Sequence, residues 1–185
     1  MTPVEQLETI VPSLNGLVER MWHGQLEYSS PCNEFTVHDL LNHMIVLGGT
    51  FAPMFRGEPV PEITAPVVYG WVPAQEFVDT MNDLVAAVQS PGAMDRSIQS
   101  PVGEMDGATF CRFVALDGLV HGWDLATALG VEWDPPADVV SAVDSFARAA
   151  INDDVRASGA FAAEVAVSAD ASALDRLVAF TGRAA

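Results

Sequence analysis

The chain has 185 residues, half of them hydrophobic, so it can bury one core without disulfides or a structural metal. Its formal net charge of −17 excludes nucleic acid and anionic lipid surfaces as main partners, because their phosphate groups repel such a chain. All eight basic residues are arginines. The absence of lysine excludes Schiff-base chemistry, attachment of pyridoxal phosphate and a Walker A phosphate site.

The sequence predicts a single domain over residues 1–185 in the cytoplasm. No run approaches the roughly 20 apolar residues of a membrane span. Glu5 and Glu8 occupy the region where a secretory signal would be basic. Cys32 and Cys111 are the two cysteines, and such a pair is typical of reduced cytosolic thiols. A monomer and a homodimer are both compatible with these features.

The first half of the chain predicts three helices. Apolar residues recur at helical spacing from Pro3 to about Met21, and Pro12 predicts a kink or the start of a second piece. Thr36 and Asp39 form the pattern of a capping box for the second helix, whose last turns Gly48-Gly49 should weaken. Residues 53–73 are rich in proline and glycine and predict a long loop, and the third helix follows over residues 74–89.

The second half contains the most apolar helix. Residues 96–106 predict a small hairpin or a plain loop, and the helix over 108–129 is hydrophobic nearly all round, ending at Gly130. Two further helices are expected over 135–152 and 170–181. The pattern indicates an all-α helical bundle, and the long loop after the second helix permits a topology other than up-down-up-down.

Polar residues interrupt the apolar stripe of the helix over 108–129. Asp117 and His121 are four residues apart and share a face, and Asp124 follows one turn later. A buried carboxylate is costly unless it is paired or ligates a metal. Asp117 and His121 are therefore either an acid–imidazole pair or two metal ligands. His43, on the apolar stripe of the second helix, is the candidate third ligand, and its alternative is a core histidine.

The remaining candidates are weaker. His23 and His38 are expected at the surface, and Cys111 in the core. Cys32 precedes a helix start, where a thiol pKa can be lowered, but it has no obvious partner in the sequence. No G-x-S-x-G elbow or glycine-rich phosphate loop is present.

Two segments resemble the signatures of one family. Residues 30–43, S-P-C-N-E-F-T-V-H-D-L-L-N-H, resemble T-P-C-x-x-W-x-V-x-D-L-x-x-H, and residues 117–126, D-G-L-V-H-G-W-D-L-A, resemble acid-x-x-x-H-x-W-D-L-A. These are signatures of the metal-binding domain of mycothiol-dependent maleylpyruvate isomerase, in the DinB-like superfamily. The tail over 171–183 is similar to the end of a single-domain branch. Phe35 replaces the usual tryptophan, and Asp117 stands where the isomerases have glutamate.

The resemblance implies a DinB-like four-helix bundle that holds a divalent metal, usually zinc. It carries the ligand roles over to His43, Asp117 and His121. Three protein ligands leave one position open, as in catalytic zinc sites. In the family that position receives the thiol of mycothiol. Asp124 is expected either to orient a ligand or to cap a neighbouring helix.

The leading hypothesis is therefore a metal- and thiol-dependent transferase or isomerase acting on a small electrophile. The alternative from another class is a non-catalytic metal- or ligand-binding helical module. Metal-dependent hydrolysis is a third possibility, but it needs a general base that the sequence does not clearly supply.

Overall fold

The computed structural model describes residues 1–32, 35–61, 71–100, 103–157 and 159–184. Over these residues the protein is mainly helical, which confirms the expected all-α class. The elements, in chain order, are α1 (Pro3–Val18), the 3₁₀ helix η1 (His23–Glu27), α2 (Val37–Arg56), α3 (Ala74–Val88), β1 (Ser97–Ser100), β2 (Gly103–Asp106), α4 (Gly107–Leu129), α5 (Ala137–Ala150), α6 (Asp153–Ala157) and α7 (Ala173–Phe180).

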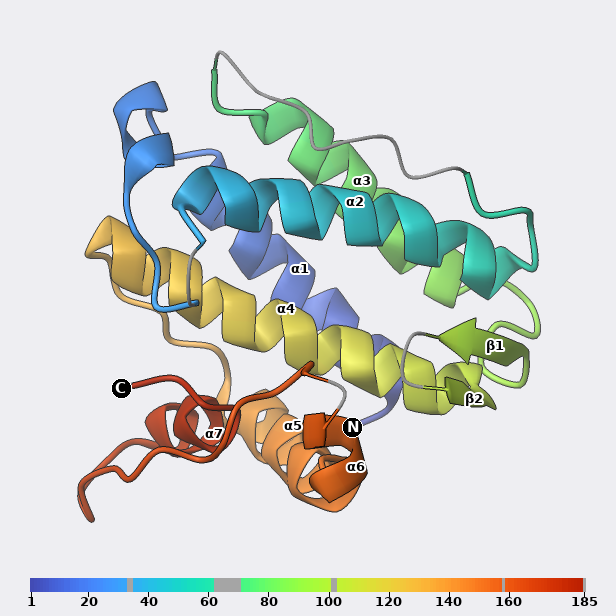
Figure 1. The fold of residues 1–185 in the computed structure, drawn as a ribbon. Helices are drawn as coiled ribbons and strands as arrows, with labels where there is room; N and C mark the ends of the chain where they lie inside the picture. Colours follow the sequence, from blue (N-terminus) through green and yellow to red (C-terminus); the bar gives the residue numbers. More distant parts are fainter. Residues whose placement is uncertain (33–34, 62–70, 101–102, 158, 185) are drawn as a thin grey trace.

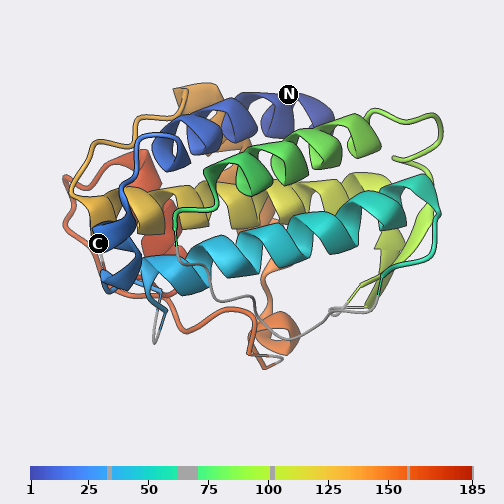
Figure 2. The same cartoon turned by 90° about the horizontal axis from the view of Figure 1, so that it is seen from above.

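Helices α1 to α4 pack as a bundle (Figures 1 and 2). Helix α1 packs on α3 and α4, and α2 packs on the same two helices from the other side. Helices α2 and α3 run in the same direction, opposite to α1 and α4, so the bundle is not a simple up-down-up-down arrangement. Helix α4 packs on α1, α2 and α5, so it is the central element. Helix α7 packs on α5.

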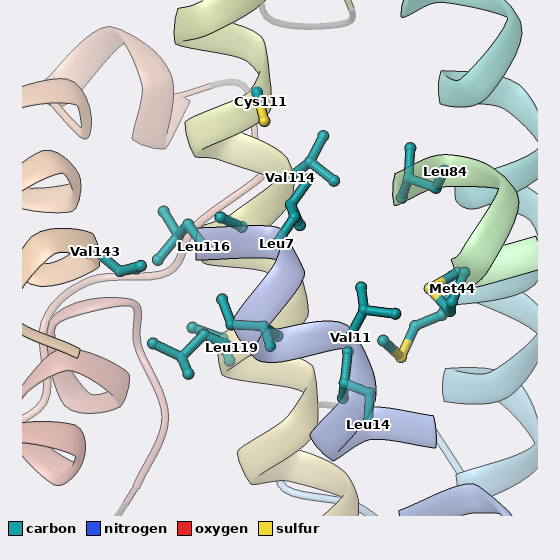
Figure 3. Packing of buried hydrophobic residues seen from close by; sticks show 14 of the residues in the cluster. Leu7, Val11, Leu14, Met44, Leu84, Cys111, Val114, Leu116, Leu119 and Val143 are labelled. Atoms are coloured by element: carbon teal, nitrogen blue, oxygen red, sulfur yellow. The ribbon is translucent and has the colours of Figure 1, made fainter. Parts of the chain in front are cut away.

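The core lies where α1 meets α4. Leu7, Val11 and Leu14 of α1 recur every three or four residues and are all buried. They lie beside Val114 of α4 and face Met44 of α2 and Leu84 of α3, all three buried, as Figure 3 shows. Helix α4 buries residues around almost its whole circumference, as its continuous apolar sequence predicts. A polar side chain on α4 therefore needs a partner.

The ends of the two helices that carry the candidate site are well defined. Thr36 Oγ1 accepts a hydrogen bond from the Asp39 backbone N at 3.2 Å, and the Thr36 backbone N donates to Asp39 Oδ2 at 2.9 Å. This is the predicted capping box, and it starts α2 two turns before His43. Helix α4 ends at Gly130, whose φ of +67° is strained for residues with a side chain.

Two helix boundaries differ from the predictions. Helix α1 ends at Val18 and continues through Pro12 without a second piece, and α2 continues through Pro53 to Arg56. A proline inside a helix removes one hydrogen bond. Burial of Phe55 offsets that loss, and the Arg96 guanidinium donates to the Phe55 carbonyl at 3.1 Å. The loop expected over residues 53–73 therefore begins after Arg56, and residues 62–70 of it lie outside the described residues.

Gly48 has a packing role that was not predicted. A Cβ at this position would lie 2.7 Å from side-chain atoms of Met81 and Thr80, so the glycine permits close approach of α3. A Cβ at Gly49 would meet none of the described residues within 4 Å. The two glycines were expected in the last turns of the helix, but α2 continues past them to Arg56.

The predicted hairpin is present. Strands β1 and β2 pair antiparallel, with Ser97 opposite Asp106 and Ser100 opposite Gly103. In the part of the chain that the structure describes, no helix is both long enough and apolar enough to cross a membrane.

Candidate metal centre

The structure brings His43, Asp117 and His121 together. His43 comes from α2, and the other two residues are one turn apart on α4. Asp117 Oδ1 lies 3.5 Å from His43 Nε2 and 3.4 Å from His121 Nε2. The imidazole rings meet edge to face, with centroids 4.8 Å apart. These three residues form a group whose ligand atoms all lie within 4.8 Å of one another.

The donor set fits a divalent metal. His43 Nε2 is buried and has no hydrogen-bond partner among the described residues, which is costly for a ring nitrogen unless something outside the chain occupies the site. Two imidazoles and one carboxylate are a common set of catalytic zinc ligands. Bonds of about 2.1 Å in a tetrahedron separate neighbouring ligand atoms by about 3.4 Å. The distances from Asp117 Oδ1 to the two Nε2 atoms are of this size.

Asp124 orients His121. Its Oδ2 lies 2.9 Å from His121 Nδ1, and the Asp124 side chain is completely buried. A carboxylate at this position accepts a hydrogen bond from Nδ1–H, keeps the proton on Nδ1 and leaves Nε2 free to bind a metal. Of the two predicted roles for Asp124, orienting a ligand is the one that this geometry supports.

Arg183 balances the charge of Asp124. Its Nη2 lies 3.1 Å from Asp124 Oδ2, and its Nε lies 3.4 Å from Oδ1. Arg183 is 59 residues from Asp124 in sequence and was not predicted as a site residue. The tail motif Thr181-Gly182-Arg183 was recognised by resemblance, but nothing in its spacing indicates a contact with α4.

Asp117 and His121 perturb each other. Burial raises the pKa of the Asp117 carboxyl, but the positive charge of His121 and the proximity of both histidine rings outweigh it and hold that pKa far below its usual range. Burial lowers the pKa of His121, but Asp117 and then Asp124 raise it to about 9. Without a metal, therefore, the pair is ionised at neutral pH. A metal at this site would displace the proton from His121.

A cavity of about 530 Å³ opens beside the three residues. Its volume is in the range of pockets that bind small molecules. One end is polar and contains the three candidate ligands with Cys32 and Arg183. The rest of the described wall is largely apolar, and its large side chains are Phe35, Leu47, Phe51, Phe110, Phe113, Val114, Leu116, Val120 and Phe161.

Cys32 belongs to a second possible group, with His121 and Asp124. Cys32 Sγ lies 3.6 Å from Arg183 Nη2. Both Asp124 oxygens already contact His121 or Arg183, and the guanidinium would repel a cation there. Burial raises the pKa of the Cys32 thiol, against the lowering effect of Arg183. The group of His43, Asp117 and His121 is therefore the better metal site.

The other sequence candidates lie outside both groups. His23 is exposed at the start of η1. His38 Nδ1 lies 3.7 Å from Asp39 Oδ1. Cys111 is buried in the core, as expected, and burial raises its pKa to about 12.

Comparison with known proteins identifies relatives in one species. Two uncharacterised proteins of Mycobacterium tuberculosis, from strains CDC 1551 / Oshkosh and ATCC 25618 / H37Rv, are each 28% identical to this chain over 184 residues. Each alignment covers 99% of this chain and 98% of the relative. No family model and no solved structure matches the chain.

Proposed function

We propose that the chain is a metal- and thiol-dependent transferase or isomerase that acts on a small electrophile. The metal is divalent, with zinc as the first choice, and the thiol is mycothiol or a similar small molecule. The observation that carries the proposal is the buried Nε2 of His43, which lies beside Asp117 and His121 at the polar end of a cavity. Within the part of the chain that the structure describes, this nitrogen has no hydrogen-bond partner.

Each polar residue has a part in this proposal. His43, Asp117 and His121 would hold the metal, and Asp124 keeps the Nδ1 proton of His121 in place. When bound, the metal supplies a positive centre that stabilises a thiol as its thiolate. Arg183 neutralises Asp124, so this pair adds no net charge. One carboxylate, two neutral imidazoles and a divalent ion would then carry a net charge near +1. A thiolate would bring this to zero, which favours its binding in a partly apolar cavity.

The arrangement of the helices supports the DinB-like fold as part of the proposal. Four helices pack in one bundle, α2 runs parallel to α3, and the ligands come from α2 and α4. Cys32 and Cys111 are both free thiols, in keeping with a reducing compartment such as the cytoplasm.

Cobalt substitution tests the proposal directly. The protein is loaded with Co²⁺ and titrated with 2-mercaptoethanol while the absorption spectrum is recorded. We expect a new thiolate-to-cobalt charge-transfer band in the wild type and in Cys32→Ser, but not in His43→Ala. A Co²⁺ spectrum that does not respond to the thiol would contradict thiol activation and favour a non-catalytic metal-binding module. A band that already exists before thiol addition and is lost in Cys32→Ser would show that Cys32 closes the site.

A further inference from the structure

The apolar part of the cavity forms an arm that starts at the candidate metal ligands. Helices α2 and α4 run in opposite directions, so residues after His43 on α2 lie beside residues before Asp117 on α4. Phe51 of α2 and Phe110 of α4 meet edge to face with centroids 4.8 Å apart, which confirms the alignment. Phe51 is eight positions after His43, so the arm extends about 12 Å along α2.

The walls of the arm are apolar side chains that remain partly exposed. Leu47, Phe51 and Phe113 line the cavity and are only half-buried, although each lies in a long helix of the bundle. Apolar surface that lines a concave site gains free energy when a ligand covers it. The arm is therefore suited to an apolar group.

The cavity has little capacity to bind an additional anion. Arg183 is the one arginine among the described lining residues, and both its Nε and its Nη2 are directed at Asp124. The chain has no lysine, and positions 33–34, 62–70, 101–102, 158 and 185 contain no arginine or histidine. Asp117 adds a negative charge at the polar end. Both ring nitrogens of His121 already face carboxylates, those of Asp117 and Asp124. A carboxylate placed in the arm would thus lose its hydration without gaining a cationic partner that is not already engaged.

From these observations we infer that the electrophile is an uncharged molecule with an aromatic or similarly apolar body, and that this body occupies the arm between α2 and α4. That this molecule is an electrophile rests on the function proposed above. The binding preference itself follows from the walls of the arm, and it holds whether or not a metal and a thiol are present. Dicarboxylates and other small anions are excluded from the arm.

Binding of neutral probes tests the inference without any assay of activity. N-phenyl-1-naphthylamine, an uncharged dye that fluoresces in apolar surroundings, is titrated into the protein as purified and after dialysis against EDTA. Methyl cinnamate and cinnamate, which differ mainly in charge, then compete for the site. We expect saturable dye binding in both preparations. In the EDTA-treated protein, the ester should displace the dye at a concentration about tenfold lower than the carboxylate, because only the carboxylate must be desolvated.

Two leucine variants locate the binding. Leu47→Gln places an amide in the arm and should weaken dye binding, while Leu17→Gln makes the same change at a half-buried leucine of α1 outside the cavity and should not. Thermal unfolding of both variants establishes that they are folded. Displacement of the dye by methyl cinnamate in the wild type is a second readout, and it does not depend on whether either variant folds.

The inference is overturned if cinnamate or maleate displaces the dye from the EDTA-treated protein as well as the ester does, or if Leu17→Gln and Leu47→Gln weaken binding equally. These outcomes are independent of the proposed function. A protein that binds zinc but prefers carboxylates in the arm would retain its thiol chemistry with another substrate class. A protein that binds the dye but no metal would retain the apolar ligand preference without that chemistry.

Discussion

His121 Nδ1 lies 2.9 Å from Oδ2 of Asp124, a carboxylate that is completely buried on the same helix. This contact determines which ring nitrogen of His121 faces Asp117. Arg183 approaches the same carboxylate from the end of the chain, at 3.1 Å. A chain of contacts therefore joins the C-terminal segment to the candidate metal ligands.

Replacing Asp124 with asparagine should weaken both metal binding and folding. Asp124→Asn removes the charge that orients His121, and such a loss typically lowers metal affinity by about 10- to 100-fold. It also leaves Arg183 mostly buried without its carboxylate, which should lower the free energy of unfolding by about 3 kcal/mol. Competition with a fluorescent zinc chelator and urea unfolding measure the two effects.

The control for this variant is Asp144→Asn. Asp144 pairs with Arg148 at 3.0 Å on α5, and both side chains are much more exposed. Removing a surface pair of this kind should cost about 0.5 kcal/mol or less and leave zinc affinity unchanged. Equal effects of the two substitutions would show that Asp124 has no special relation to the metal ligands.

Metal binding should release a proton from His121. The pKa of His121 in the metal-free protein is raised to about 9, so the ring is protonated at pH 7.5 and must lose that proton to bind a metal. We expect close to one proton released per metal at this pH, and weaker apparent affinity as the pH falls. Calorimetric titration with zinc in two buffers of different ionisation enthalpy gives the proton count. A count of zero would mean that His121 is outside the metal site or that its ring is already neutral at this pH, and metal binding by His121→Ala separates the two.

The metal-free protein should lose stability as the pH rises. The folded pKa of His121 lies near 9 against an ordinary value of 6.5, so the protonated ring stabilises the fold fully below pH 6.5. That contribution disappears as the pH rises through 9. Urea unfolding of EDTA-treated protein at both pH values measures the change. Asp117→Asn should flatten this dependence, because Asp117 is the main group that raises the pKa.

Much of this site follows from sequence periodicity, and part of it does not. Asp117, His121 and Asp124 share one face of a helix whose apolar pattern is strong, so their proximity was predictable. The pairing with His43 needed the packing of α2 on α4, which the resemblance implied and the structure shows. Arg183 was missed as a site residue because contacts across 59 residues leave no periodic signal. The continuation of α2 through Pro53 was missed because burial of Phe55 overrides a local breaker.

Gly48 and Gly49 should respond in opposite ways to alanine. Gly49→Ala adds a methyl group in open space and should stabilise α2 by about 0.5–1 kcal/mol through helix propensity. Gly48→Ala forces Met81 and Thr80 to move and should be destabilising by about 1–2 kcal/mol. Thermal unfolding compares the two. Stabilisation by both would mean that α3 does not approach α2 closely at Gly48.

Cys32 should be dispensable for metal binding. Its thiol lies at the polar end of the cavity, but its neighbour Arg183 disfavours a cation, and burial raises its pKa. Cys32→Ser should keep the zinc content and affinity of the wild type, with Cys111→Ser as the matched thiol control. Loss of zinc in Cys32→Ser alone would assign the metal to Cys32, His121 and Asp124 instead.

The most direct test is the metal content of untagged protein by elemental analysis. His43→Ala and Asp117→Asn are compared with the wild type, and His23→Ala and Asp144→Asn serve as matched controls away from the site. We predict close to one divalent metal per wild-type and control chain, with zinc most abundant, and clear loss in the two ligand variants. A wild type that contains no metal, and takes up none during dialysis against zinc, would contradict the account. Asp117 and His121 would then be an ion pair of the core.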